Sequence, residues 1–345
     1  MLRIGKRGPH LAVTIKDIAE RAGVSVNTVS RALNNKPEIS PETREKIIEI
    51  ARSLNYTPNI LARSLVLKQT YTLGLVVPDN SDPFYAQLAK GVEATAIKRQ
   101  YNAILCNTDE NPNKEIDVLK LLREKRVDGI LITTVQKDAA YFKKMLRDEI
   151  PFVFLNRHMD DLDVDYVIND NVAGAYEAVS FLIQLGHKRI AHITGPAHLS
   201  SVREREKGYR KALEDHGLEA SGSLIFRSDS LKIAAGYNVM KSLLASDSRI
   251  TAVFAFCDLL AIGAYKAIIE AGLNVPGDIS IIGYDDIEFA EFLEVPLTTV
   301  AQPTYEIGQI GTEILIERLK GNSFETRRVV LKPRLVVRKS CRNLS

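Results

Sequence analysis

The sequence predicts an α/β protein in which an N-terminal three-helix domain precedes two doubly wound parallel-sheet subdomains. Two observations predict this order. Between residues 14 and 54, apolar side chains recur at helical spacing between capping residues, whereas from Leu73 onward short apolar runs alternate with amphipathic stretches. The 345 residues, 45% of them hydrophobic, are enough to bury the cores of two or three domains.

Residues 14–54 have the pattern of three short helices. Thr14 and Ser25 are placed to cap the first and second helices, and Gly23 is placed to end the first. Ser40 and Pro41 are suited to begin the third. The second helix leaves three side chains pointing outward: Val26, Asn27 and Arg31. This pattern matches a helix-turn-helix, in which the second helix enters the major groove of DNA.

The positive charge is concentrated in this first part of the chain. Residues 1–69 contain 12 Lys and Arg against 6 Asp and Glu, and the remainder contains 34 against 37. The overall charge of +3 hides this asymmetry. A basic N-terminal domain can replace the counterions on phosphate, which favours DNA binding over the alternative of a three-helix module with merely solvated arginines.

The side-chain chemistry separates base-reading candidates from phosphate-binding ones. Arg31 can form a fork with guanine, Asn27 suits adenine and Val26 can pack on a thymine methyl group. Short or planar polar side chains that suit phosphate oxygens follow the same segment: Thr14, Ser25, Thr28, Ser30, Asn34, Tyr56 and Asn59. Any one of these could instead serve only as a helix cap.

The sequence of residues 58–70 is typical of a hinge between two domains. Pro58 is suited to begin a helix, but one of under about 12 residues is marginal by itself in water. A segment that becomes helical only against DNA would have this sequence, and a linker that is always ordered is the alternative.

The remaining chain predicts two parallel sheets. The apolar runs LGLVV, NAILC, GILIT and FVFL alternate with helical stretches, and RIAHIT, AVFAF and SIIGY repeat the pattern after about residue 168. Such runs are typical of strands covered on both faces, so we expect two subdomains with a cleft between them. Ligands of such sheets bind beyond the carboxyl ends of the strands. The candidates there are Asp82, Phe84, Arg205, Asp258 and Asp285. Asp82 and Asp258 could instead only cap helices.

Several segments resemble the lactose-repressor family of bacterial transcription regulators. Residues 14–65 resemble its headpiece and hinge. Five later segments resemble, in the same order, parts of the family's effector domain: TLGLVVPDNSDPFY, GHKRIAHITG, FCDLLAIGAYKA, SIIGYDD and LTTVAQP. The resemblance implies a fold of the periplasmic-binding-protein type and a repressor that binds a pseudo-palindromic operator as a homodimer. It also implies control by a small effector, a sugar or related metabolite, in the cleft.

The resemblance also implies roles for particular residues. Ile15 matches a further groove contact in the DNA-binding domain. Ala62 and Leu65 match the residues that enter the minor groove, where an apolar wedge kinks the duplex. Arg205 and Asp285 match effector positions, and Asn156 and Gln302 match weaker ones.

The resemblance further implies the domain limits. Residues 1–57 are expected to form the headpiece, and 58–70 the hinge helix and linker. Residues 1–12 have no counterpart in the family's headpiece, so a flexible basic extension and a mis-set start codon are the alternatives for them. Residues 71–345 are expected to form the effector-binding and dimerisation domain, with an N-subdomain of about 71–168 and 299–330 and a C-subdomain of about 169–298 and 331–345. The final helix and the strand-like stretch RRVVLKPRLVV are expected to return the chain across the cleft. No leucine-heptad tail follows, so a dimer is expected rather than a tetramer.

Two departures affect the expected ligand. Cys257 stands where the lactose repressor has an amide side chain, and Leu231 stands about where relatives often have an aromatic one.

Parts of the N-subdomain resemble the catabolite control protein of this family, whose co-repressor is a phosphorylated carrier protein. Glu288 falls near the position of an arginine used in that contact, and its charge argues against this alternative.

Other classes of protein are disfavoured. There is no GxGxxG turn, P-loop or HExxH pair, so we expect neither an enzyme nor a cofactor. The three cysteines lack metal-ligand spacing, so neither a metal site nor a disulfide framework is expected. No 18-residue apolar run predicts a membrane span, and the N-terminus lacks the apolar core of a secretory signal, so we expect a cytoplasmic protein. The alternative is a sugar-binding protein without a regulatory role. The absence of a secretory signal and the presence of the headpiece argue against it.

Overall fold

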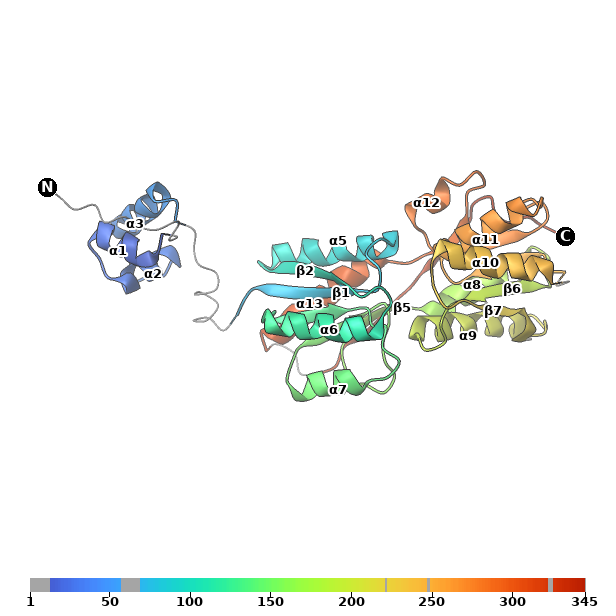
Figure 1. Ribbon diagram of the computed structural model, residues 1–345, viewed down its shortest axis with the longest axis horizontal. Coiled ribbons are helices and arrows are strands. Elements are labelled where there is room, and N and C mark those ends of the chain that lie inside the picture. Colours follow the sequence, from blue (N-terminus) through green and yellow to red (C-terminus); the bar gives the residue numbers. More distant parts are fainter. Residues whose placement is uncertain (1–12, 57–68, 221, 247–248, 322–324, 345) are drawn as a thin grey trace. The chain divides into compact units, whose positions relative to one another are not determined.

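The computed structural model of the chain describes residues 13–56, 69–220, 222–246, 249–321 and 325–344. The chain divides into two compact units, residues 1–70 and 71–345 (Figure 1). The expected hinge at 58–70 lies almost entirely outside the described residues. None of the helices in the described ranges is both long and apolar enough to cross a membrane.

The first unit contains the three helices that the sequence predicts. They are α1 (Ile15–Ala22), α2 (Val26–Leu33) and α3 (Pro41–Ser53). Gly23 ends α1 in the left-handed conformation, with a φ of 72° that glycine adopts without steric cost. One buried cluster joins the helices: Ile18, Ala19, Ala22, Val29, Ala32, Ile47 and Ala51. This small core fixes which face of α2 remains outside.

The second unit contains two six-stranded sheets, one in each subdomain. The N-subdomain sheet has the order β11-β5-β4-β3-β1-β2, and the C-subdomain sheet has the order β12-β10-β9-β8-β6-β7. Every neighbouring pair is parallel except β10 and β12. The strands of the N-subdomain are β1 (Thr72–Val77), β2 (Asn102–Asn107), β3 (Gly129–Ile132), β4 (Phe152–Leu155), β5 (Tyr166–Asn169) and β11 (Arg328–Leu331). Those of the C-subdomain are β6 (Ile190–Thr194), β7 (Ile225–Arg227), β8 (Ala252–Ala255), β9 (Ser280–Asp285), β10 (Thr298–Ala301) and β12 (Arg334–Val336).

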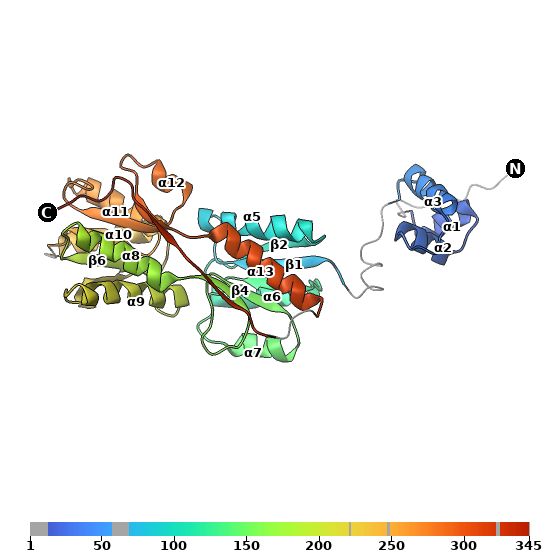
Figure 2. The same cartoon turned by 180° about the vertical axis from the view of Figure 1, so that it is seen from behind.

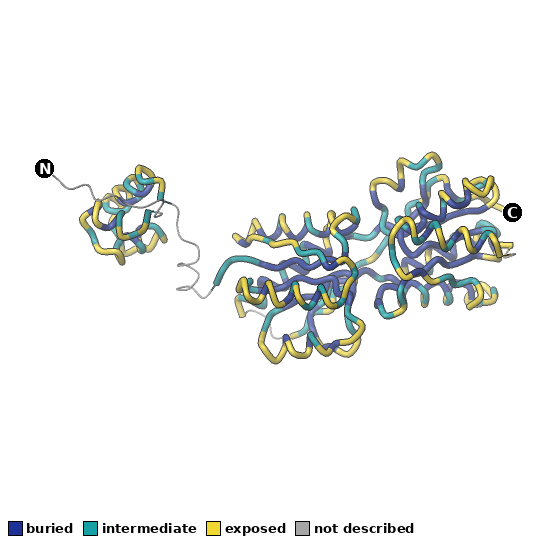
Figure 3. The backbone as a smooth tube through the Cα atoms, viewed as in Figure 1, coloured by how far each residue is buried: buried dark blue, intermediate teal, exposed yellow. Residues whose placement is uncertain are grey.

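Helices cover both faces of each sheet, as continuous apolar strands require. On the N-subdomain, α5 (Pro83–Lys98) and α13 (Thr304–Leu319) share one core, and α6 (Pro112–Glu124) and α7 (Ala140–Arg147) share the other. On the C-subdomain the pairs are α8 (Asn171–Gln184) with α9 (Ser200–Asp215), and α10 (Ile233–Ala245) with α11 (Asp258–Glu270). A short helix, α12 (Glu288–Glu291), follows β9. Figure 3 shows the central strands of both sheets as deeply buried, whereas the edge strand β2 is largely exposed.

Three segments connect the subdomains. The chain crosses between β5 and α8, between β10 and α13, and between β11 and β12. Figure 2 shows the last of these running past α13 and α8. The boundary expected at 298/299 is wrong, because it falls inside β10, whose residues Thr298 to Ala301 all pair in the C-subdomain sheet. The boundary at 330/331 likewise falls inside β11, because Leu331 still pairs with β5.

Candidate DNA-binding and effector-binding sites

The outward face of α2 carries the three base-reading candidates. The core fixes this orientation, because Val29 and Ala32 are buried while Asn27 and Arg31 are exposed. Val26 is 37% exposed although it is apolar. Ile15 differs from these residues, because it is half-buried and packs against the headpiece core. The helix therefore presents a donor fork, an amide and an apolar side chain together on one face.

The phosphate-binding candidates include several helix caps. The backbone N–H of Thr14 donates to Asp17 Oδ2 at 2.8 Å, and the backbone N–H of Thr28 donates to Ser25 Oγ at 3.1 Å. Asn34 donates from Nδ2 to the backbone carbonyl of Ser30 at 2.8 Å. Tyr56 is half-buried against the headpiece core. The remaining expected DNA contacts lie outside the described residues: Asn59, Ala62 and Leu65.

Arg205 is at the centre of the polar groups at the carboxyl end of the C-subdomain sheet. It is 2% exposed, and its guanidinium carbon lies 3.6 Å from the ring centroid of Tyr284 and 4.3 Å from that of Phe256. Its Nε donates to Asn171 Oδ1 at 2.9 Å, and Nη1 donates to the backbone carbonyl of Phe256 at 2.5 Å. Nη1 also lies 3.7 Å from Asp285 Oδ1. The sequence thus places a fixed, buried cation where the strands end.

Asp285 and Gln302 complete this group. Asp285 Oδ1 accepts a hydrogen bond from Gln302 Nε2 at 2.6 Å. Burial raises the pKa of Asp285 well above its ordinary value, and the charge of Arg205 opposes this rise. Asp285 has a φ of 118°, which non-glycine residues rarely adopt. Such strain is concentrated at functional sites in proteins.

Asp258 has a structural role in the C-subdomain. It is the first residue of α11 rather than its cap, which is Cys257. Its Oδ2 accepts from the backbone N–H of Ile287 at 2.9 Å and its Oδ1 accepts from the hydroxyl of Thr299 at 2.6 Å. A Cβ added at Gly283 would lie 2.0 Å from Asp258 Oδ1, so only glycine fits on the strand beside it. Both oxygens of this carboxylate are therefore already engaged in holding α11 to β10 and to the segment that follows β9.

Asp82 and Phe84 are also engaged in the fold. Asp82 caps α5, and its Oδ1 accepts from the backbone N–H of Phe84 at 2.9 Å. Burial raises the pKa of Asp82 to about 6, against this hydrogen bond. Phe84 is 5% exposed and packs edge-on against Tyr85 in the N-subdomain core. Asp82 thus lies at the carboxyl end of β1 as expected, while the ring of Phe84 is mostly enclosed.

Unpaired polar atoms collect where the strands end. Within the described residues, six of the eleven buried side-chain atoms without a hydrogen-bond partner lie just after β3, β4 and β10 or in the last residue of β5 and β6: Thr133 Oγ1, Asn156 Oδ1, Arg157 Nε, Gln302 Oε1, Asn169 Oδ1 and Thr194 Oγ1. A buried polar group without a partner costs about 1–3 kcal/mol. A ligand that supplies these partners between the subdomains would remove that cost.

Arg157 was missed by the sequence analysis. It follows β4, is 2% exposed and donates to Glu110 Oε1 at 3.3 Å and to the backbone carbonyl of Thr134 at 3.3 Å. Burial works to lower the pKa of Arg157, but the carboxylate of Glu110 holds it above its ordinary value. The signal that could have identified it is its position directly after an apolar strand, the same criterion that selected Asp285.

Glu115 holds the loop after β3 in place. It is fully buried on α6, where it accepts from the hydroxyl of Thr134 at 2.9 Å and from the backbone N–H of Val135 at 2.7 Å. Burial raises its pKa from 4.5 to about 7. Between these values the folded protein binds more protons than the unfolded chain, so this group lowers the stability as the pH rises through that window.

The substitution Glu115→Gln is therefore expected to increase the stability of the folded protein most near neutral pH. The gain in unfolding free energy of the variant over the wild type should be larger at pH ~7 than at pH ~5 by about 2 kcal/mol, because the neutral amide does not have to be ionised in the core. Urea unfolding at both pH values measures this difference. The exposed Asp117→Asn on the same helix is the control and should show none. Identical pH dependence in wild type and Glu115→Gln would contradict the assignment.

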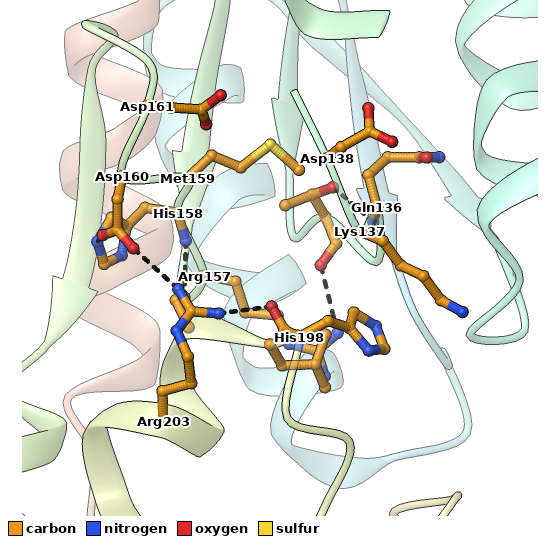
Figure 4. A pocket seen from close by; sticks show the side chains of 13 residues that line it. Gln136, Lys137, Asp138, Arg157, His158, Met159, Asp160, Asp161, His198 and Arg203 are labelled. Carbon is orange, nitrogen blue, oxygen red and sulfur yellow. Dashed lines mark hydrogen bonds and ion pairs between the residues drawn. The ribbon is translucent and has the colours of Figure 1, made fainter. Parts of the chain in front are cut away.

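A pocket of about 150 Å³ lies where the loops after β3 and β4 face the beginning of α9 (Figure 4). Both subdomains line it. Several contacts join its two sides; among them, Arg203 Nη2 donates to Asp160 Oδ2 at 2.9 Å, and the backbone N–H of His158 donates to Ser200 Oγ at 3.1 Å. Arg157 belongs to its wall as well as to the group around Glu110.

Known proteins share this combination of parts over the whole chain. Residues 14–59 match the model of "bacterial regulatory proteins, lacI family", and residues 70–339 match that of "periplasmic binding proteins and sugar binding domain of LacI family". The ribose operon repressor of Escherichia coli (strain K12) is 38% identical over 328 residues, which cover 95% of this chain and 99% of that protein.

Solved structures agree with this match. The lac repressor dimer bound to operator and the anti-inducer ONPF has a TM-score of 0.87 at 29% identity, covering 95% of this chain and 99% of that one. A LacI family transcriptional regulator from Enterococcus faecium with bound ribose has a TM-score of 0.72 at 32% identity, covering 79% and 100%. Together with the three-helix headpiece and its exposed α2 face, these matches show that the chain is a DNA-binding transcription regulator that belongs to the lacI family of bacterial regulatory proteins.

Proposed function

We propose that this regulator is a repressor that binds a pseudo-palindromic operator as a homodimer, and that a sugar or related metabolite bound between its subdomains controls that binding. The observation that carries the effector site is the pairing of Arg205 with Asp285 among unpaired polar atoms at the strand ends. A guanidinium and a carboxylate side by side can share the hydroxyl groups of one sugar. The ribose bound to the Enterococcus faecium protein supports a ligand of this class.

Residue roles follow from the same geometry. Arg205, Asp285 and Gln302 would bind hydroxyl groups, and the unpaired Oδ1 of Asn156 would accept a hydrogen bond from the ligand. Asp82 would contribute its carboxylate from the opposite subdomain. Asp258 would act only through the position of its neighbours, because the fold occupies both of its oxygens.

On DNA, the exposed face of α2 would read bases through Val26, Asn27 and Arg31, and Ile15 would add a groove contact. Ala62 and Leu65 in the hinge would enter the minor groove. Register would be set by phosphate contacts from Thr14, Ser25, Thr28, Ser30, Asn34, Tyr56 and Asn59.

A small molecule fits this chain better than a phosphorylated carrier protein. Glu288 is exposed on α12, so a phosphorylated partner that docked there would meet a like charge. The polar groups that point to a ligand are those between the subdomains. We also propose that the protein has no catalytic activity. It would work in the cytoplasm and be associated with the nucleoid when bound to DNA.

A homodimer is supported by apolar side chains that the second unit leaves exposed. Ile104 and Leu105 lie on β2, the edge strand of the N-subdomain sheet, and are 42% and 46% exposed. Phe289 and Phe292, in and next to α12, are 60% and 76% exposed. Exposed apolar groups on an edge strand and a short helix favour burial against a second copy.

Selection of binding sites from random DNA by the full-length protein tests this function. We expect an inverted repeat, because two headpieces related by a two-fold axis read two equivalent half-sites. Sedimentation of the same protein should give a dimer at micromolar concentration. Enrichment of a single unrepeated site, or a stable tetramer, would contradict the proposal.

A further inference from the structure

The pocket between the loop after β4 and the beginning of α9 has the features of an anion site. Its 150 Å³ is less than the roughly 300–1,000 Å³ of pockets that enclose a whole ligand, so it suits one group of a larger molecule. It lies next to the proposed effector site. Arg157, which lines the pocket, is close enough to Asp82 for its charge to act on the pKa of that carboxyl group.

The amino end of α9 opens into this pocket without a cap. The N-cap position is Leu199, whose side chain cannot accept a hydrogen bond. Among the described residues, no hydrogen-bond partner is found for the backbone N–H groups of Ser200 and Ser201. The free N–H groups and the helix dipole at such an end favour a negative charge.

A buried cation faces the same space. The Nε of Arg157 has no hydrogen-bond partner within the described part of the chain, although the residue is only 2% exposed. The bonds that its other nitrogens make to Glu110 are long, at 3.3 and 3.4 Å. Arg157 therefore retains donor capacity that the fold itself does not use.

The acidic groups of the pocket are already engaged, while one lysine is not. Asp160 binds Arg203 at 2.9 Å, and Asp161 binds Lys143 at 2.9 Å. Asp138 accepts from the backbone N–H of Ala140 at 2.9 Å. By contrast, Lys137 forms no ion pair with any residue that the structure describes. Figure 4 shows Lys137 on the other side of the pocket from Asp160.

The same cations act on His198, which also lines the pocket. Its pKa is lowered from the ordinary value by burial and then by the charges of Lys137 and Arg157. A bound anion would offset these charges and raise the pKa of His198 again.

We propose that this pocket, termed the anion pocket, binds the phosphate or carboxylate group of an acidic effector, such as a sugar phosphate or a sugar acid. The anion would accept hydrogen bonds from the end of α9 and from Arg157, while the sugar hydroxyl groups occupy the site at Arg205 and Asp285. The choice of effector class thus rests on the proposed function, although the binding of an anion to the pocket does not. Because both subdomains contribute to the pocket, an anion there also holds them together.

Inorganic phosphate is the direct probe of the pocket in the full-length protein. Titration at constant ionic strength, followed by the imidazole resonance of His198, should show saturable binding and a raised pKa for His198. The double variant Lys137→Gln with Arg203→Gln should weaken this binding at least tenfold. Lys144→Gln, which removes an exposed cation of α7 that does not line the pocket, is the matched control and should bind phosphate like the wild type.

Calorimetry with matched sugars then tests the effector class. Glucose 6-phosphate and ribose 5-phosphate represent phosphates, glucuronate represents sugar acids, and glucose and ribose are their neutral counterparts. At least one acidic compound should bind tenfold or more tightly than its neutral counterpart, and the double variant should remove that preference without changing the affinity for the neutral sugar.

The outcomes separate this inference from the proposed function. No saturable effect of phosphate on His198, or binding unchanged in the double variant, overturns the anion pocket. Tight binding of a neutral sugar that has no acidic preference overturns the acidic effector but leaves the proposed sugar response standing. Phosphate binding at His198 with no sugar of either kind bound supports the pocket and overturns the sugar effector.

Discussion

Replacing Arg31 with alanine is expected to weaken binding to the selected operator by about 1–3 kcal/mol and to abolish the preference at one base pair in each half-site. Arg31 is exposed on the face of α2 that the headpiece core leaves free. A guanidinium there can form two parallel hydrogen bonds to guanine, and alanine can form none. Fluorescence anisotropy with the operator and its single-base variants measures both effects.

The matched control is Arg52→Ala, which removes an exposed cation from α3 rather than from α2. It should leave the ranking of operator variants unchanged, because loss of charge alone weakens all sequences alike. Full discrimination among operator variants by Arg31→Ala would show that α2 is not the recognition helix.

Asp285→Asn is expected to abolish the effector response. Asparagine tolerates the positive φ of this position but removes the charge next to Arg205. Each lost hydrogen bond to a charged group weakens binding by about 1.5–3 kcal/mol. Arg205→Ala should have the same effect, with an added loss of packing on Tyr284. If the effector is an inducer, both variants should still bind operator. If it is a co-repressor, both should fail to bind tightly at all.

The control for these variants is Asp258→Asn. Its carboxylate is as deeply buried, but it bonds to Ile287 and Thr299 within the fold. It should lower the thermal stability while keeping the effector response. A ligand at 100 times its dissociation constant stabilises the folded state by about 2.7 kcal/mol, so thermal shift measures effector binding in every variant. An unchanged response in both Asp285→Asn and Arg205→Ala would move the site towards Asp82 and Asn156.

Local signals were sufficient to predict the headpiece. Ser25, Gly23 and Pro41 each act within one helical turn, and their positions determine where α1, α2 and α3 begin or end. The sheets were predictable for a similar reason, because a continuous apolar run needs no distant partner to be identified as a buried strand.

Contacts between distant segments could not be predicted in this way. Asp258 contacts Thr299 across 41 residues and Arg157 contacts Glu110 across 47. Nothing in the local sequence indicates that Asp258 would be engaged by the fold or that Arg157 would keep an unpaired Nε. The subdomain limits near 298/299 and 330/331 fell inside β10 and β11 for the same reason, since strand pairing rather than composition decides where the chain leaves a sheet.

The proposed control of DNA binding rests on coupling between two sites. If the hinge is helical only with Leu65 in the minor groove, an effector needs only to change the spacing of the two hinges in the dimer to change operator affinity. Couplings of this kind are typically about 1–3 kcal/mol. Because coupling is reciprocal, the operator must change the affinity for the effector by the same factor.

Measuring effector affinity with and without saturating operator therefore tests the central claim most directly. Isothermal titration of the full-length protein gives the effector dissociation constant in both states, and anisotropy gives the operator dissociation constant with and without effector. The account predicts two equal factors of about 5–150. Effector binding that is the same with and without operator, while the protein still binds both, would contradict it.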